Sequence, residues 1–266
     1  MKNNTVTSRK SNPLVQSAVI LSLSALMCVL FTAFNPPVFN IEGFEAIASR
    51  VQLTPQRLSY WWRFLLSTML FGIVPLLTSW ALGLRREQLG LTSGIAFMKQ
   101  PLFLLALPVA LLIGVSGGAS PDLGSYYPYA RDLSEIVGKN GIGHLGGHLA
   151  AYFFFYYLPW EFFFRGFLLM PFALAARSLC EGLDADSSQK QAGLLLLSAA
   201  ILFQTIPSTM LHFGHPFSEL LSAIPAGLVF GYIAYSSRSI VPALLLHALV
   251  GFGTDGYIIL NSLGVF

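Results

Sequence analysis

Seven long apolar runs with few charged side chains inside them constrain this sequence more than any other feature. The runs cover residues 15–34, 62–84, 101–115, 149–176, 193–207, 220–235 and 240–260. A helix needs about 20 mainly apolar residues to cross a bilayer, and a helix satisfies its backbone hydrogen bonds within one segment there. Only 10% of the 266 residues are charged, which excludes a soluble fold. We therefore expect an all-α, polytopic transmembrane helical bundle of about seven to eight spans.

Positive charge in the short loops predicts the orientation of the chain in the membrane. A cytoplasmic N-terminus puts more Lys and Arg residues inside than outside. The inside group is Lys2, Arg9, Lys10, Arg85, Arg86, Lys99, Arg177, Lys190 and Arg238, and the outside group is Arg50, Arg57, Arg131 and Lys139. The net charge is only +3 and the basic residues are scattered, so we expect membrane lipid and not nucleic acid as a partner. The loop 117–143, rich in Gly and Tyr, is predicted to be an ordered interfacial loop.

Two opposite charges interrupt the fourth apolar run. Glu161 and Arg165 are four residues apart, so they share a helical face and can pair. A charge at the middle of a bilayer costs at least about 2.5 to 3.5 kcal/mol, which makes each one a candidate for function. Two interpretations remain open: a pair that neutralises itself, or a carboxylate kept ionised by Arg165 for base chemistry. The run is too long for one crossing, and Pro159 within it predicts a kink or a break.

A polar junction separates the fifth and sixth runs, where Gly214 and Pro216 end one helix and allow another to begin. His212 falls in the last turn of the fifth helix. Glu219 falls in the first turn of the sixth, where a carboxylate suits the positive end of the helix dipole. We interpret His215 as structural and His212 as the candidate for chemistry.

The last run contains His247, with Asp255 about two turns later. A buried histidine without a partner is costly. We expect His247 to be satisfied by a carbonyl or by Asp255, or to face Glu161 and His212. One carboxylate and two histidines from three helices could activate a water directly or hold a divalent metal with an open position. The spacing does not choose between these two chemistries.

A second pair of histidines, His144 and His148, is also four residues apart and could share a metal. The pair lies among glycines at an expected membrane boundary, so we favour a role without metal. The sequence holds no His-Glu-x-x-His run, the usual signature of a zinc peptidase.

The order of these features resembles a known family of intramembrane endopeptidases. The chain has an acid-x-x-x-Arg-Gly helix, a His-Phe-Gly-x-Pro junction followed by Glu, and a Ser-Ile-x-Pro segment that leads to Leu-Leu-His. Over about residues 152–255 this pattern resembles the CAAX-protease and bacteriocin-processing (CPBP or Abi) family, which includes the CAAX prenyl endopeptidases. The resemblance implies a catalytic helical core at 141–266 after N-terminal helices and an interfacial loop at 1–140, within one integral membrane domain. It also favours a prokaryotic plasma membrane.

The resemblance further implies roles for single residues. The family has three motifs: Glu-Glu-x-x-x-Arg, a segment that ends in His, and His-x-x-x-Asn. In the family, an acid and a histidine activate the water, and polar groups of the third motif stabilise the oxyanion. Glu161 matches the second glutamate and Arg165 the arginine. His212 and His247 match the two histidines. We expect Glu161 and His212 to activate the water, Arg165 to orient Glu161, and His247 to stabilise the tetrahedral intermediate.

Three positions depart from the family pattern. Trp160 stands at the first glutamate, Ser208 stands where the second motif often has Phe, and Gly251 stands at the asparagine. By analogy, the loss of an oxyanion donor at Gly251 costs about 10²–10³-fold in rate unless Asp255, a backbone amide or water compensates.

Three functions follow, in decreasing order of preference. The first is an intramembrane endopeptidase that cleaves a membrane-associated or lipid-modified peptide. The second is a catalytically impaired relative that acts as a membrane scaffold or immunity protein, which Trp160 and Gly251 favour. The third is a proton-coupled transporter, which the lack of an inverted repeat disfavours. Straight helices would place His212 and His247 at opposite membrane surfaces, but the residue pattern places them in one site.

Overall fold

The structure, a computed structural model, describes residues 12–35, 44–50, 54–182 and 186–266. Within these residues all regular structure is helical. Seven helical spans are long and apolar enough to cross a membrane: Pro13–Phe34, Pro55–Ala81, Pro101–Gly118, Gly143–Glu181, Ser187–Met210, Phe217–Ser237 and Val241–Ser262. The prediction of an all-α polytopic bundle is confirmed, at seven spans in the described residues. The chain is an integral, multi-pass membrane protein.

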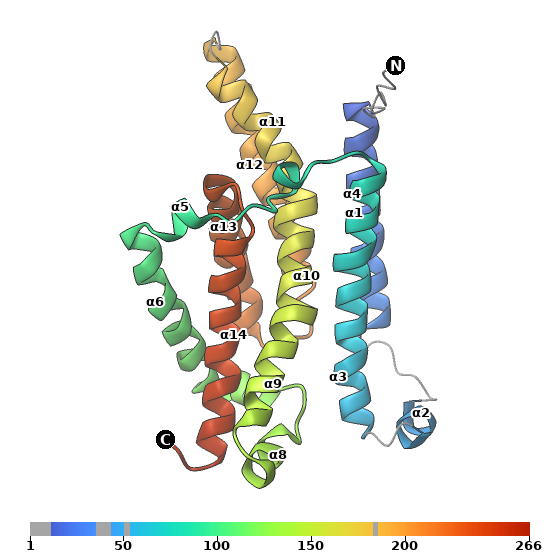
Figure 1. The fold of residues 1–266 in the computed structure, drawn as a ribbon, viewed down its shortest axis with the longest axis vertical. Helices are drawn as coiled ribbons and strands as arrows, with labels where there is room; N and C mark the ends of the chain where they lie inside the picture. The colour runs from blue at the N-terminus through green and yellow to red at the C-terminus, as the bar shows by residue number, and fades with distance from the viewer. Residues whose placement is uncertain (1–11, 36–43, 51–53, 183–185) are drawn as a thin grey trace, which may run out of the picture.

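Five spans are single helices and two are composite. The single helices are α1 (Pro13–Phe34), α6 (Pro101–Gly118), α12 (Ser187–Met210), α13 (Phe217–Ser237) and α14 (Val241–Ser262). The second span joins α3 (Pro55–Leu66), the π-helical η1 (Ser67–Ile73) and α4 (Val74–Ala81). The fourth joins α9 (Gly143–Tyr152), η3 (Phe153–Tyr157), α10 (Leu158–Glu161), η4 (Phe162–Leu169) and α11 (Met170–Glu181). Between the spans lie the short helices α2 (Phe44–Arg50), η2 (Arg86–Leu89), α5 (Ile95–Met98), α7 (Pro121–Tyr126) and α8 (Leu133–Asn140) (Figure 1).

Several spans begin earlier than the apolar runs predict, because polar residues cap their first turns. The side chain of Asn12 accepts a hydrogen bond from the Leu14 backbone N–H at 2.9 Å. Asp186 and Gln189 form a reciprocal capping box at the start of α12. Such caps satisfy backbone N–H groups that have no partner inside the helix. Hydropathy alone does not register them, so it misplaces the helix starts.

The fourth span runs through the centre of the bundle (Figure 1) and carries much of its core. It is helical throughout, with π-helical turns on both sides of α10 in place of the predicted break at Pro159. A proline lacks the N–H that would bond the carbonyl four residues earlier, here that of Phe155. The Thr68 hydroxyl on η1 donates to this carbonyl at 3.3 Å. A neighbouring span thus restores a hydrogen bond that lipid cannot supply.

Glycines allow α6 and α14 to pack with their backbones in contact. A Cβ added at Gly114 would overlap the Val250 carbonyl, and one added at Gly118 would crowd the Thr254 carbonyl. The Thr254 hydroxyl also donates to the Gly114 carbonyl at 3.1 Å. Small residues spaced four apart are typical of such close contacts between membrane helices. The last span is therefore held firmly against α6.

The α11–α12 pair is offset along the bundle. In Figure 1, α11 and α12 extend past the upper ends of α13 and α14. The turn after α12 brings the His212 ring to 5.7 Å from the ring of Trp160, which lies in the middle of the fourth span. His212 therefore lies beside the middle of the fourth span although it follows the end of α12, because the helices do not share the same ends.

Candidate active site

Glu161 stands in a buried ion cluster that joins the fourth span to the last. Its Oε1 lies 2.7 Å from Nδ1 of His247 and 3.2 Å from a guanidinium nitrogen of Arg165. The Glu161 and Arg165 side chains are 0% and 3% exposed, whereas the His247 side chain is 23% exposed. A carboxylate this deeply buried requires such partners, because an unpaired charge in the interior is strongly disfavoured. The structure thus brings three of the predicted residues together.

Helix geometry sets the direction of each group. Glu161 ends α10 and Arg165 follows four residues later in η4, on the same face. His247 lies in the second turn of α14, with its ring 4.9 Å from Tyr157 and 5.6 Å from Phe230. Since a carboxylate accepts, the proton of this contact lies on Nδ1 of His247. The other ring nitrogen, Nε2, is left for a reacting group.

His212 lies in the turn between α12 and α13, and the structure does not place it against Glu161. Its Nδ1 lies 2.7 Å from the Ser208 carbonyl oxygen, so Nδ1 carries the proton and Nε2 can accept. Burial lowers the pKa of His212 to about 4, although the nearby Glu219 carboxylate opposes this effect. Smaller contributions from His215 and His247 also lower it. His212 is therefore a neutral imidazole near pH 7.

Glu219 is the carboxylate beside His212, with Oε1 3.9 Å from its Nε2. The same oxygen lies 3.1 Å from Nδ1 of His215 and accepts from the Tyr127 hydroxyl at 2.7 Å. Burial raises the pKa of Tyr127 well above its usual value, so the hydroxyl remains a donor. His215 also contacts the Tyr129 hydroxyl at 3.2 Å. The predicted interfacial loop is thus an ordered cover over Glu219.

Asp255 does not reach His247, contrary to one of the alternatives. Its Oδ2 lies 2.8 Å from Nε2 of His148, and Nδ1 of His148 lies 3.0 Å from the Tyr60 hydroxyl. The His148 and Asp255 side chains are only 3% and 6% exposed. Two turns separate Asp255 from His247, so the two acids of this region serve two different histidines.

The described residues do not bring together the donor sets that the sequence suggested for a metal. Among the residues that the structure describes, no three His, Cys, Asp or Glu side chains gather as a bound metal would require. Glu161 binds His247 and Arg165, while His212 lies beside Glu219. His148 points to Asp255 and Tyr60 rather than sharing a ligand with His144. The donor sets suggested by the sequence, Glu161 with His212 and His247 or His144 with His148, are therefore not assembled.

Trp160 fills an aromatic core rather than a polar site. It is 3% exposed and packs edge-on against Phe71 at 5.6 Å and Phe31 at 6.3 Å. On its other side it meets His212. Glu161, the next residue, points to a different helix, as a rotation of about 100° per residue requires. The Glu161 side chain therefore lies toward His247 and Arg165, away from the side of the helix that carries Trp160.

Tyr157 is a site residue that the sequence analysis missed. A Cβ added at Gly251 would overlap the Tyr157 hydroxyl oxygen, so this hydroxyl occupies the space of a side chain at position 251. Tyr157 precedes Glu161 by four residues and follows the same helical face. This spacing of four residues from Glu161 could have identified Tyr157 as a site residue from the sequence. A hydroxyl thus stands beside His247 where the family motif has an amide.

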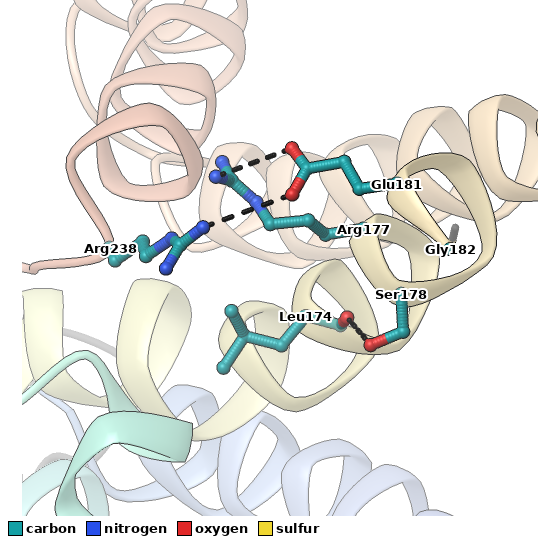
Figure 2. Close-up of a pocket in the computed structure, with 6 residues that line it drawn as sticks. All are labelled: Leu174, Arg177, Ser178, Glu181, Gly182 and Arg238. Atoms are coloured by element: carbon teal, nitrogen blue, oxygen red, sulfur yellow. Dashed lines mark hydrogen bonds and ion pairs between the residues drawn. The ribbon is translucent and has the colours of Figure 1, made fainter.

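A charged pocket lies away from these residues. Figure 2 shows it at the end of α11, where Arg177 and Arg238 point toward Glu181 at 3.7 and 3.9 Å. Its volume is about 350 Å³. Arg177 follows Arg165 by twelve residues, roughly 18 Å along a helix. This pocket is an ion cluster at the end of α11 and not part of the polar centre.

Membrane-embedded acids and histidines converging from separate spans define a polytopic membrane protein with a buried acid–histidine centre. The model of the type II CAAX prenyl endopeptidase Rce1-like family matches residues 145–253. This segment is similar to that family of CAAX prenyl endopeptidases, and the predicted resemblance over 152–255 is confirmed. It contains Glu161, His212 and His247. Searches of curated proteins and of solved structures gave no match.

Proposed function

We propose that the protein is an intramembrane endopeptidase that hydrolyses a peptide bond in a membrane-associated peptide with water activated by an acid and a histidine. The observation that carries this proposal is the buried contact of 2.7 Å between Glu161 and His247 within the family domain. Lipid-modified peptides are one fitting substrate class, because the polar groups lie among membrane-spanning helices. Bacteriocin or signalling peptides are another.

The roles follow from the hydrogen bonds. His212 is neutral and offers Nε2 to the attacking water. His247 donates from Nδ1 to Glu161. As an imidazolium whose charge Glu161 balances, it also donates from Nε2 to the oxyanion. Arg165 fixes the Glu161 carboxylate. Glu161 and Arg165 are thus positioning residues, and Glu161 acts through His247 rather than directly on the water.

The first test is cleavage of a membrane-anchored peptide library by purified protein in lipid. Glu161→Gln keeps the size of the side chain but removes its charge, so kcat should fall about 10²–10³-fold with little change in KM. Glu181→Gln serves as the matched control, since Glu181 is half-exposed in the distant ion cluster. Cleavage at equal rates by wild type and Glu161→Gln would refute the proposed role.

A membrane scaffold or immunity protein is the second candidate, and the burial of Trp160 against His212 favours it. A scaffold predicts no cleavage by the wild type across a broad library. It also predicts that Glu161→Gln and His212→Ala leave partner binding unchanged. Capture of membrane partners by wild type and both variants tests this alternative.

The orientation with a cytoplasmic N-terminus, in a prokaryotic plasma membrane, is part of the proposal. Lys2, Arg9 and Lys10, which helped to predict it, lie outside the described residues. Cys180 lies on the end predicted to face the cytoplasm, and Ser125 is exposed at the other end. A membrane-impermeant maleimide should label Ser125→Cys in intact cells and reach Cys180 only after permeabilisation. The reverse pattern would overturn this orientation.

A further inference from the structure

His212 lacks an acid from the fourth span. Position 160, which meets His212 from that span, holds a tryptophan, and the rings of Trp160 and His212 lie 5.7 Å apart. Glu161 is bound by a guanidinium and an imidazole. Both partners contact Oε1 of Glu161, and this side chain is turned toward them and fully buried. An acid that works with His212 must therefore come from elsewhere.

Glu219 is in place to be that acid. It begins α13, seven residues after His212, and the turn between them brings its Oε1 to 3.9 Å from Nε2 of His212. Hydrogen bonds from Tyr127 and contact with His215 fix this oxygen. The side chain is 18% exposed, whereas Glu161 is fully buried. The Glu219 carboxylate is thus held in place and is more accessible than that of Glu161.

The two facing groups suit a bound water. Because Nδ1 of His212 donates to the Ser208 carbonyl, its Nε2 can only accept. The Glu219 carboxylate also accepts. Two acceptors 3.9 Å apart are too distant to bond each other, but one water that donates about 2.8 Å to each can bridge them. In addition, Oε2 of Glu219 is buried without a hydrogen-bond partner among the described residues.

We propose that Glu219 and His212 together bind and activate the hydrolytic water, so that Glu219 supplies from α13 the carboxylate that position 160 lacks. This inference rests on the proposed peptidase function. It assigns the proton acceptor to a residue outside the fourth span, and it explains how the chain hydrolyses a peptide bond with Trp160 in its core.

The step conserves atoms and charge. The water gives one proton to Glu219 while its oxygen bonds the carbonyl carbon, and the carbonyl electron pair moves onto its oxygen, which His247 stabilises. The C=O bond then re-forms and the C–N bond breaks. Its electron pair stays on nitrogen, which takes the proton from Glu219. Throughout the step, Nε2 of His212 accepts a hydrogen bond from the other O–H of the water and so keeps the water oriented.

The test is steady-state cleavage of a membrane-anchored peptide by Glu219→Gln, compared with wild type and Glu161→Gln. A glutamine can still accept from Tyr127, so the turn should be retained, and thermal unfolding in detergent checks this. We expect kcat to fall at least 10²-fold with KM within about threefold, the size of general-base catalysis. Glu135→Gln, at an exposed site in the covering loop, is the matched control and should cleave as wild type does.

The outcomes separate this inference from the function on which it rests. If the wild type cleaves no peptide, both the peptidase function and the role of Glu219 are refuted. Cleavage lost in Glu161→Gln but reduced less than tenfold in a folded Glu219→Gln would overturn only the role of Glu219. A loss confined to KM would also overturn it, because a residue that merely shapes the site would behave in that way.

Discussion

Two buried acid–histidine pairs join the fourth span to the last, and they differ in what surrounds them. Glu161–His247 carries an added guanidinium, and its histidine is 23% exposed. His148–Asp255 ends in the Tyr60 hydroxyl, and both of its side chains are almost fully buried. A pair that is satisfied on every side can only hold helices together. A pair with a free ring nitrogen can also meet a substrate.

The largest difference between the pairs should appear in turnover. His247→Ala removes the group that we propose stabilises the oxyanion, so kcat should fall about 10³-fold, equivalent to about 4 kcal/mol of transition-state stabilisation. Cleavage of the anchored peptide at saturating concentration measures this. His148→Asn, in the other pair, should keep kcat within threefold per folded molecule. A comparable loss of kcat in both variants would erase the distinction between the pairs.

For the free energy of unfolding, the larger effect should come from the His148–Asp255 pair. Asp255→Ala leaves His148 buried without its acid, and breaking a buried pair by removing one partner typically costs about 3–5 kcal/mol. Chemical denaturation in mixed micelles reports the free energy of unfolding. The folded fraction should retain its turnover. An Asp255→Ala protein as stable as wild type would show that this pair does not clamp the helices.

Gly251 lies on α14 between His247 and Asp255, beside the Tyr157 hydroxyl. A substitution at Gly251 tests whether Tyr157 works with the Glu161–His247 pair. Gly251→Ala pushes a methyl group into the Tyr157 hydroxyl, so stability should fall by about 1–3 kcal/mol. Activity should fall about tenfold as the ring moves against His247. Gly256→Ala is the matched control, since a Cβ there has open space. Equal effects of the two alanines would contradict the packing described.

The smallest expected effect concerns pH. Since the pKa of His212 is lowered to about 4, the ring stays neutral well below its usual range. It can accept from water only when neutral, so kcat/KM should change less than twofold between pH 7 and 5.5 and should fall as the pH approaches 4. A pH profile of cleavage measures this. A decline centred near pH 6.5 would show that burial does not shift His212.

The sequence predicted those features that depend on local spacing. Seven apolar runs gave the spans, and the separation of four residues between Glu161 and Arg165 gave their pairing. It could not predict features set by the offset and rotation of whole helices. Asp255 lies 107 residues from its partner His148, and only the packed bundle reveals that pairing.

The polar junction shows the same limit. His212 reaches the middle of the fourth span because α12 extends past the ends of α13 and α14 (Figure 1). The sequence of α12 alone does not reveal this offset. The tyrosines over Glu219 come from a loop almost a hundred residues earlier. The filling of Gly251 by Tyr157 depends on how two helices approach. The candidate residues were therefore predictable, whereas their division into pairs was not.

The backbone contact between α6 and α14 has a mechanical consequence. At Gly114 neither helix can slide or rotate without a collision, so the last span acts as the fixed wall of the centre. The acid beside His212 is held in a different way. Tyr127 and Tyr129 reach Glu219 and His215 through side-chain contacts. A backbone contact thus fixes the helix that carries His247, whereas side-chain contacts between the loop and α13 hold Glu219 in place.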